Sequence, residues 1–258
     1  MTDQANAIKP TWQEQFKIKA FQVDTQSRCR LSSILNFLQE AAGNHASHLG
    51  VGYNDLIINN KAWVLSRLFI NVNYYPEWGE SIEVETWPSA YDRIFAYRDF
   101  CFKDSKGVRF AYGKTAWVIM DIASRRMSPV SELVESFEHF PDKLGVEEMP
   151  AKVRPVKDER FPCSAEYTVR HSDLDTNEHV NNVKYIQWML DDYGLEWHKN
   201  HQVSYLSINY LAEALPNLEL CHSFNKVNMN PIDFVHSLKR RSDDKPICQA
   251  KISWKSQI

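Results

Sequence analysis

The chain contains two weakly similar halves, and this internal repeat limits its possible folds more than any other feature of the sequence. Three pairs of segments align at offsets that decrease along the chain: residues 22–28 with 173–179 at 151, residues 70–76 with 210–216 at 140, and residues 114–117 with 251–254 at 137. The order of the segments is preserved, and shorter loops in the second half explain the falling offset. Such a repeat predicts one structural unit that is used twice.

Each half carries the same order of expected elements. After a short strand near residues 15–23, the apolar residues from Leu31 to Ala42 follow helical spacing, and those from Val183 to Trp197 do so in the second half. Strand-like runs follow each helix, at residues 62–74, 81–87, 94–102 and 108–121, and again at 202–211, 218–224, 232–239 and 247–254. One long helix followed by an antiparallel meander, used twice, predicts an α+β fold of the tandem (double) hotdog type.

A polar stretch that contains prolines separates the two halves. We expect an N-terminal hotdog over residues 1–137, a linker over residues 138–160 and a C-terminal hotdog over residues 161–258. Hydrophobic residues make up 43% of the chain, which is enough to bury a core. Glycine is scarce, with eight residues, and no glycine-rich phosphate loop is present. The composition therefore favours long strands over a nucleotide-binding fold.

Charge and cysteine usage argue against several classes of protein. The net charge is −3, and acidic and basic residues are mixed along the chain, so a nucleic-acid partner is not expected. No apolar run approaches the length of a membrane span, and the first residues lack the apolar core of a signal peptide. The five cysteines are scattered, without the spacing of a zinc site or a disulfide framework. We therefore expect free thiols and a cytoplasmic protein without membrane association.

A carboxylate, an amide and an imidazole lie together in sequence just before the second helix. Asp175, Asn177 and His179 are spaced i, i+2 and i+4, and an extended backbone brings alternate side chains to one side. This trio suggests hydrolytic or acid–base chemistry if a further partner lies nearby. A simpler alternative is that Asp175, Asn177 and Asn181 are turn and N-cap residues, and the segment alone favours this alternative.

A metal site is not expected. Residues 173–177 imitate the start of a calcium loop, but Glu178 stands where that loop needs glycine and Lys184 where it needs a bidentate glutamate. A transition-metal site built from Asp175, His179 and a glutamate farther along the chain, Glu213, would have only one good nitrogen ligand. We expect neither a metal nor a cofactor.

The chain resembles the acyl-acyl carrier protein (acyl-ACP) thioesterase family, which includes plant plastid enzymes and bacterial relatives. The resemblance covers nearly the whole chain. Its strongest element, Asp173-Leu-Asp-Thr-Asn-Glu-His-Val-Asn-Asn-Val-Lys-Tyr-Ile186, differs little from the family's signature before the second helix. A second element, from Ala116 to Met127, resembles the strand and Thr-Arg-Arg turn that close the first hotdog. The resemblance thus implies a tandem hotdog that hydrolyses thioesters.

The resemblance also implies a fourth catalytic residue. In the family a glutamate follows the signature histidine on a strand of the same hotdog, and Glu213 occupies that place here. Plant members carry a cysteine where this chain has Ala214, so a thiol mechanism at that position is impossible here.

Each of the four residues receives a role on chemical grounds. Glu213 is the expected general base, with an acyl-Glu213 anhydride as the covalent alternative. Asn177 can hold the water or the substrate carbonyl. The nearby helix dipole disfavours the charged form of His179, which would then orient Glu213 or protonate the leaving thiol. Asp175 would fix the ring or the loop, and backbone N–H groups of residues 180–182 are the expected oxyanion donors.

The corresponding residues of the first half retain only the aspartate. The counterparts are Asp24 for Asp175, Gln26 for Asn177, Arg28 for His179 and Asn73 for Glu213. We therefore expect the first hotdog to be catalytically silent and to supply the pocket for the acyl chain.

The resemblance implies acyl carrier protein as the partner, with a phosphopantetheine-linked fatty acyl chain. This carrier is acidic, so basic groups should steer it. The candidates for carrier contact are Arg125, Arg126, Lys239, Arg240 and Arg241, with Lys152, Arg154 and Lys157 in the linker region. A tandem hotdog already contains the pairing that single hotdogs gain by dimerising, so a monomer and a homodimer are both compatible with the sequence.

The implied reaction is hydrolysis of fatty acyl-ACP to free fatty acid and holo-ACP, which terminates fatty-acid elongation. Two alternatives stay open. The first is an acyl-coenzyme A thioesterase, and the second is a tandem hotdog that binds acyl thioesters without cleaving them.

Overall fold

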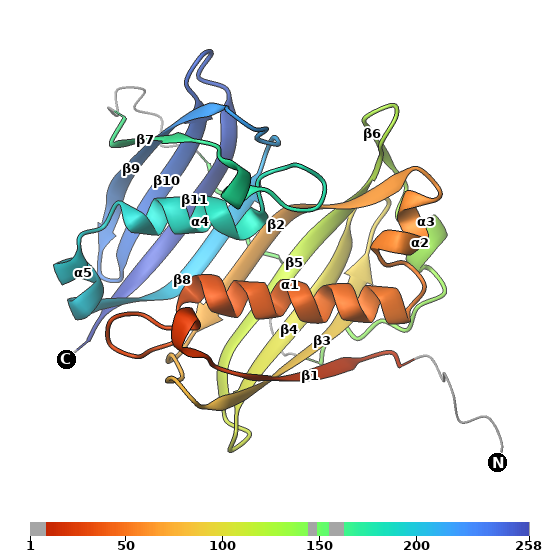
Figure 1. The fold of residues 1–258 in the computed structure, drawn as a ribbon. Coiled ribbons are helices and arrows are strands. Elements are labelled where there is room, and N and C mark those ends of the chain that lie inside the picture. The colour runs from red at the N-terminus through yellow and green to blue at the C-terminus, as the bar shows by residue number, and fades with distance from the viewer. Residues whose placement is uncertain (1–8, 144–148, 155–162, 258) are drawn as a thin grey trace.

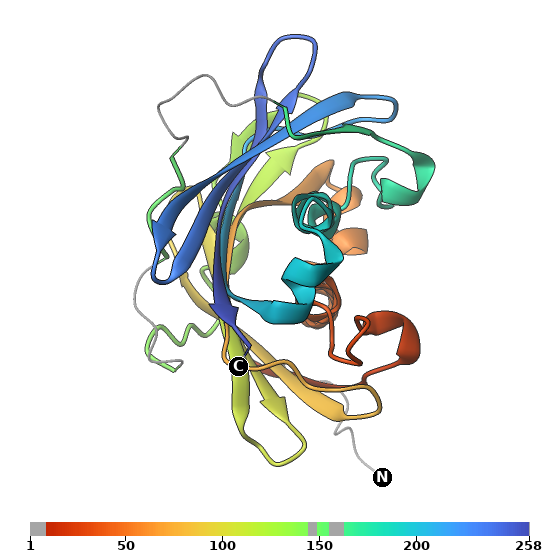
Figure 2. The same cartoon turned by 90° about the vertical axis from the view of Figure 1, so that its left-hand side faces the viewer.

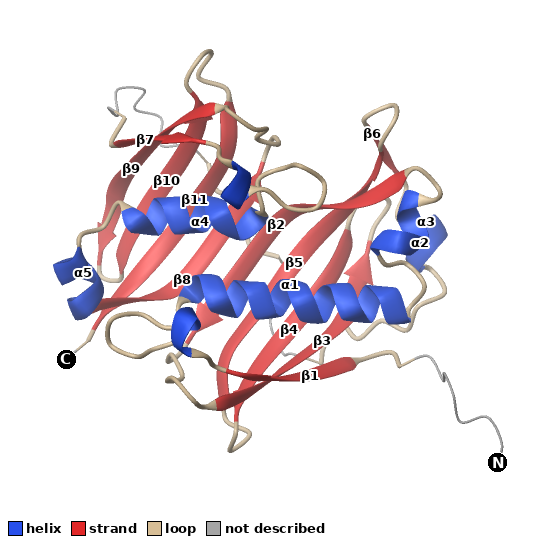
Figure 3. Ribbon diagram, in the orientation of Figure 1, coloured by secondary structure: helices blue, strands red, loops and turns tan. Residues whose placement is uncertain are grey.

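The computed structural model describes residues 9–143, 149–154 and 163–257. Its strands form one antiparallel sheet in the order β1-β3-β4-β5-β2-β8-β11-β10-β9-β7, with β6 paired to β5 (Figure 1, Figure 3). The strands of the first half are β1 (Trp12–Lys17), β2 (Lys61–Val72), β3 (Ser81–Tyr91), β4 (Ala96–Asp104), β5 (Arg109–Asp121) and β6 (Arg126–Ser128). Those of the second half are β7 (Ala165–Thr168), β8 (His201–Tyr210), β9 (Glu219–Met229), β10 (Ile232–Arg240) and β11 (Pro246–Ser256).

The helices lie on one face of this sheet. They are α1 (Leu31–His48), α2 (Tyr53–Ile57), α3 (Ser131–Val134), α4 (Asn182–Asp191) and α5 (Leu195–Asn200), and short 3₁₀ turns cover Ala20–Gln22 and His171–Asp173. Figure 2 shows α1 and α4 on the same concave side of the curved sheet. No helix of the described residues has the length and apolarity needed to cross a membrane.

The two halves join through β2 and β8 at the centre of the sheet. These strands are antiparallel, with Leu68 opposite Ile208 and Ile70 opposite Leu206. All four side chains are buried, and burying an aliphatic side chain of this size contributes about 2 kcal/mol. The tandem hotdog predicted from the repeat is therefore confirmed, and its halves share one sheet and one hydrophobic core.

Amphipathic spacing explains the position of α1. Leu31, Ile34, Leu35 and Leu38 recur at intervals of three or four residues and are at most 5% exposed, so one stripe of the helix faces the sheet. In the second half the same spacing is interrupted. The helix expected to continue from Val183 to Trp197 ends at Asp191, because an extended Gly194 forms the N-cap of α5.

The first strand also differs from the expectation. It covers Trp12–Lys17 rather than residues 15–23, because the chain turns into a 3₁₀ segment at Ala20–Gln22. Parts of the predicted linker, residues 144–148 and 155–160, lie outside the described residues, and so does the candidate carrier contact Lys157. The division at residues 137 and 161 stays a prediction.

The expectation of five free cysteines is wrong. Cys163 and Cys221 form a disulfide although 58 residues separate them. Antiparallel pairing of β7 with β9 places Glu166 opposite Cys221 and so brings the segment before β7 next to β9. Cys29, Cys101 and Cys248 are free and buried. No local spacing of cysteines can predict a bridge that depends on strand pairing.

One alignment within the repeat also needs correction. Strand β2 has a bulge at Ser66 and β8 has one at Ser204, since each serine is skipped in the register with the neighbouring strand. If the two bulges are equivalent, residues of β8 correspond to residues of β2 with numbers lower by 138, not by 140. Glu213 therefore corresponds to Tyr75 rather than to Asn73, and the structure agrees at the next residue as well. The N–H of Cys29 donates to Pro76 O, as the N–H of Val180 donates to Ala214 O.

Candidate active site

Asp175 organises the loop that precedes α4. Its Oδ1 accepts hydrogen bonds from the N–H groups of Asn177 (2.8 Å) and His179 (3.3 Å). Its own N–H donates to His179 O (2.8 Å), and Glu178 adopts a positive φ of 60° between them. Of the two roles expected for Asp175, the structure thus shows the one in which the carboxylate shapes the loop.

Several of the expected oxyanion donors at the start of α4 already form hydrogen bonds within the protein. Asn181 is the N-cap, and its Oδ1 accepts from Val183 N–H at 2.9 Å. The N–H groups of Val180 and Asn181 already donate to Ala214 O (3.1 Å) and Asp173 O (2.9 Å). The oxyanion role expected for these two amides is therefore wrong. Asn182 N–H, the first of the helix, has no acceptor within the described part of the chain.

His179 and Glu213 lie in contact within the second hotdog. His179 Nε2 is 3.4 Å from Glu213 Oε2, and both side chains are partly exposed. Glu213 follows β8 in a short loop that α4 holds in place. Within this loop, Ala214 N–H donates to the hydroxyl of Tyr185 at 3.2 Å.

Tyr185 is a residue of the site that the sequence did not reveal. It belongs to α4 and is 3% exposed. Burial raises its pKa above the ordinary range, so the phenol stays neutral and accepts the hydrogen bond from Ala214. In the sequence, Tyr185 looks like a core residue of the helix. A tyrosine that only packs in the core and one that also supports a loop cannot be distinguished by their positions along a helix.

Arg125 makes a contact that its sequence position did not predict. It lies between β5 and β6 of the first half, and its Nη2 is 2.5 Å from Glu213 Oε2. We expected Arg125 and Arg126 to contact the carrier, yet the first of them is paired with the catalytic candidate. Among the other predicted contacts, Arg240 pairs with Asp243 and Arg241 with Glu166, whereas Lys239 has a partly exposed side chain.

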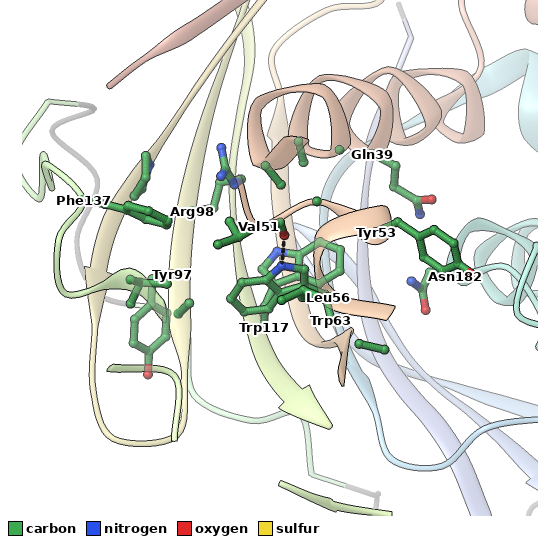
Figure 4. A pocket seen from close by; sticks show the side chains of 18 of the residues that line it. Gln39, Val51, Tyr53, Leu56, Trp63, Tyr97, Arg98, Trp117, Phe137 and Asn182 are labelled. Carbon is green, nitrogen blue, oxygen red and sulfur yellow. Dashed lines mark hydrogen bonds between the residues drawn. The ribbon is translucent and has the colours of Figure 1, made fainter. Parts of the chain in front are cut away.

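A cavity of about 360 Å³ lies next to the loop. It is lined by side chains of α1, α2 and β2–β5 of the first half, and by Asp175, Asn177 and Asn182 of the second half. Figure 4 shows Trp63 and Trp117 in the wall, with Asn182 beside Tyr53. Trp63 is fixed by a hydrogen bond from its Nε1 to Val51 O at 2.8 Å. The cavity thus joins apolar walls from one hotdog to polar groups from the other.

A basic side chain, Arg98, lies in the wall of this cavity. Arg98 donates from Nη1 to His45 Nδ1 at 2.7 Å, and His45 is fully buried. Burial lowers the pKa of Arg98 to about 10, and burial followed by the charge of Arg98 lowers the pKa of His45 to about 4. His45 is therefore neutral near pH 7 and serves as an acceptor.

A second group of titratable side chains lies in the core of the second half. His222 contacts Asp192 through Nδ1, and its Nε2 lies 3.1 Å from His236 Nδ1. His236 in turn reaches the hydroxyl of Tyr193 at 3.1 Å, and both histidines are fully buried. Burial lowers the pKa of His236 well below the ordinary value. These side chains are buried and form hydrogen bonds with one another. They are therefore less suited than the loop before α4 to act on a substrate.

The structure assembles only part of the predicted quartet. His179 and Glu213 are in contact, and Asp175 holds the backbone of the loop. Asn177 is exposed and lines the cavity, which His179 and Glu213 do not line. Within the described residues, no three His, Cys, Asp or Glu side chains are arranged to hold a metal ion. A carboxylate beside an imidazole, next to an apolar cavity, can activate water against an apolar ester or thioester.

Comparison with known proteins agrees with this arrangement. Residues 9–137 match the model of the acyl-ACP thioesterase N-terminal domain, and residues 156–256 match that of the C-terminal domain. A chloroplast palmitoyl-acyl carrier protein thioesterase of Gossypium hirsutum is 29% identical over 94% of this chain and 63% of its own length. A chloroplast dodecanoyl-[acyl-carrier-protein] hydrolase of Cinnamomum camphora is 32% identical over 77% of this chain and 55% of its own. The chain thus spans less than two thirds of the length of these curated relatives.

A solved structure gives a fuller match. The crystal structure of an acyl-ACP thioesterase from Bacteroides thetaiotaomicron has a TM-score of 0.84 and 27% identity, and the match covers 95% of this chain and 98% of that chain. The tandem hotdog of this chain is therefore the fold of that enzyme. Together with the two domain matches, which cover both halves, this shows that the chain belongs to the acyl-ACP thioesterase family.

Proposed function

We propose that this protein hydrolyses the thioester of fatty acyl-ACP, giving free fatty acid and holo-ACP and so terminating fatty-acid elongation. The observation that carries the proposal is the contact between His179 and Glu213 beside a cavity of about 360 Å³ with mainly apolar walls. Family membership and the names of the relatives support an acyl-ACP substrate.

The proposed mechanism gives each residue one task. Glu213 takes a proton from water as the water attacks the thioester carbonyl. His179 orients the carboxylate and can then pass this proton from Glu213 to the departing thiolate, which leaves both residues in their starting protonation states. Asn177 holds the water or the carbonyl, and Asn182 N–H is the remaining candidate for the oxyanion. Asp175 keeps Asn177 and His179 in place through their backbone N–H groups. In the covalent alternative, Glu213 attacks the carbonyl itself and water hydrolyses the resulting anhydride.

The two halves divide these tasks in the proposal. The N-terminal hotdog, residues 1–137, holds the acyl chain, because its helices and strands line most of the cavity. The C-terminal hotdog, residues 161–258, supplies the quartet, and residues 138–160 connect them. The carrier would approach near Glu213 and the exposed Arg126, with Lys239, Arg240 and Arg241 as further basic candidates.

Two earlier expectations stay predictions. Cytoplasmic location was inferred from the scattered cysteines and from the lack of a signal-peptide core, and the disulfide between Cys163 and Cys221 removes the first of these grounds. The plant relatives are chloroplastic. The pairing of β2 with β8 supplies the contact that single hotdogs make between subunits, which leaves a monomer and a homodimer both compatible with the fold.

Thiol release from acyl-ACP tests the proposal. The wild type and Glu213→Gln are compared on acyl-ACPs of about eight to eighteen carbons, and on acyl-coenzyme A with the same acyl group, since a difference in kcat/KM identifies the preferred thioester. We expect Glu213→Gln to lower kcat by about 100-fold or more, as for other lost general bases. Asp173→Asn, in the same loop region, is the matched control.

Three results would count against the proposal. Near-native hydrolysis by Glu213→Gln would remove Glu213 as the base. A wild type that prefers acyl-coenzyme A would favour the alternative enzyme. A wild type that binds both thioesters without releasing thiol would favour a binding module.

A further inference from the structure

Arg125 projects from a hydrogen-bonded turn of the first hotdog. Its N–H donates to Asp121 O at 2.9 Å, and its φ is +57°. Asp121 Oδ1 accepts from the N–H and the hydroxyl of Ser124, at 2.7 and 2.8 Å. The base of the Arg125 side chain is therefore fixed by several short hydrogen bonds, although the side chain itself is 59% exposed.

The guanidinium of Arg125 meets Glu213 on one particular oxygen. Arg125 Nη2 and His179 Nε2 both approach Oε2, at 2.5 and 3.4 Å. Oε1 of Glu213 has no hydrogen-bond partner within the described part of the chain. The hydrogen bond from Arg125 and the contact with His179 thus both involve one oxygen and leave the other free to accept a proton.

Folding stability does not account for this contact. An ion pair as exposed as this one contributes little to stability, because water screens the attraction and two long side chains lose freedom. Within the described residues, the neighbouring Arg126 is equally close to the site in sequence yet forms no ion pair. The contact links residues 88 positions apart, from different hotdogs, on the carboxylate that the proposed reaction needs.

We propose that Arg125 is a positioning residue for the hydrolysis: it holds Glu213 Oε2, so that Oε1 is the atom that takes the proton from water. This inference rests on the proposed function. A charge-assisted hydrogen bond from a planar guanidinium restricts the rotation of a carboxylate more than a single ammonium contact does. The site is then composite, because the silent hotdog supplies a group that orients the base of the other.

A positioning role and a docking role for Arg125 predict different kinetic effects. A group that only attracts the acidic carrier changes KM for acyl-ACP and has no effect on a thioester without a carrier protein. A group that orients the base changes kcat, and it does so on every thioester that the enzyme cleaves.

The experiment compares Arg125→Met and Arg125→Lys with Arg93→Met, at another exposed arginine of the first hotdog, as the matched control. Rates are measured on acyl-ACP and on acyl-pantetheine with the same acyl group, and thermal unfolding verifies that each variant is folded. We expect Arg125→Met to lower kcat about tenfold on both substrates with KM within about twofold. Arg125→Lys should recover part of the lost kcat, and Arg93→Met should keep the kcat of the wild type.

The outcomes distinguish this inference from the proposed function. If the wild type hydrolyses neither thioester, both the proposed function and the positioning role of Arg125 are wrong. If the wild type is active and Glu213→Gln is inactive, an Arg125→Met enzyme with unchanged kcat overturns the positioning role alone. A rise in KM for acyl-ACP alone would assign Arg125 to docking of the carrier, and an equal loss of kcat in Arg93→Met would show that the loss is not specific to Arg125. Either result overturns the positioning role.

Discussion

The two copies of the repeated loop have almost the same backbone and different side-chain contacts. Asp24 Oδ1 accepts from the N–H groups of Gln26 (2.8 Å) and Arg28 (3.0 Å), as Asp175 Oδ1 does from the two matching residues of the second copy. Ser27 and Glu178, at the same place in each loop, both have positive φ, 63° and 60°. The aspartate and the turn are thus common to both loops and cannot by themselves define an active site.

The difference lies in how much hydrogen-bonding capacity each copy leaves free. Arg28 is only 13% exposed and donates to Asp24, Gln26 and Gln257. The counterpart of Glu213, Tyr75, donates its hydroxyl to Val203 O at 2.9 Å. In the other copy, the Asn177 amide and Glu213 Oε1 have no partner in the described ranges. Asn177 is exposed to solvent, but Glu213 is half-buried. Since polar groups withdrawn from solvent are normally paired, the unpaired oxygen of Glu213 marks the copy that can act on a substrate.

The interiors of the two hotdogs differ at matching positions. Ala42 and Ala46 of α1 line the cavity, and at the loop offset of 151 they correspond to Tyr193 and Trp197. Tyr193 packs against Trp254 with ring centroids 4.8 Å apart, and Trp197 stacks on His201 at 3.9 Å. Small residues therefore leave space for an acyl chain in the first half, whereas aromatic rings pack together at the corresponding sequence positions of the second.

Exchanging the residues at positions 179 and 28 should have the largest effect. His179→Arg removes the imidazole beside Glu213, and we expect kcat to fall about 100-fold or more. Arg28→His loosens contacts in the silent copy and should lower the free energy of unfolding by about 1 kcal/mol with kcat unchanged. For both variants, kcat is measured on acyl-ACP and the free energy of unfolding is measured by denaturant titration. A comparable loss of kcat in both variants would mean that the two copies are not functionally divided.

Exchanging the interior residues should have a smaller effect. Ala46→Trp fills the cavity, and we expect about a tenfold loss of kcat/KM on sixteen-carbon acyl-ACP and little loss on eight carbons. Trp197→Ala removes a partly buried ring and should cost about 2 kcal/mol of stability with the preference for chain length unchanged. A chain-length profile of each variant measures both. An altered profile in Trp197→Ala would place part of the acyl chain in the second hotdog instead.

The strands were predicted well because their signals are local. Alternating or continuous apolar runs end at turn residues, and β5, expected at 108–121, covers Arg109–Asp121. Strand β3 was expected to end at residue 87 but continues through Pro88 to Tyr91. The register shifts between Pro88 and Ala90, and a bulge tolerates a proline that a regular ladder excludes. The break between α4 and α5 was missed because aromatic residues on both sides continue the helical spacing.

The candidate site was predictable only where the resemblance supplied long-range information. Residues 175–179 are adjacent in sequence, but nothing in their spacing identifies Glu213, which the structure places 3.4 Å from His179. The contact of Arg125 with Glu213, the support from Tyr185 and the disulfide all depend on how distant strands pair. Aligning Glu213 with Asn73 failed for a related reason, since the offset there is set by bulges in the sheet, which low sequence identity does not reveal.

Tyr75→Phe should have the smallest effect, and it tests the corrected alignment directly. Burial raises the pKa of Tyr75 above the ordinary range, so its hydroxyl is a neutral donor to Val203 O and has no acid–base role near pH 7. Removing it should lower the free energy of unfolding by about 1 kcal/mol, the net value of one hydrogen bond, and leave kcat unchanged. Tyr74→Phe, which loses a hydrogen bond to Asp104 outside the loop, is the matched control. Because Glu213 is expected to be indispensable at the equivalent position, a fall in kcat for Tyr75→Phe but not for Tyr74→Phe would show that the silent copy still contributes to the chemistry.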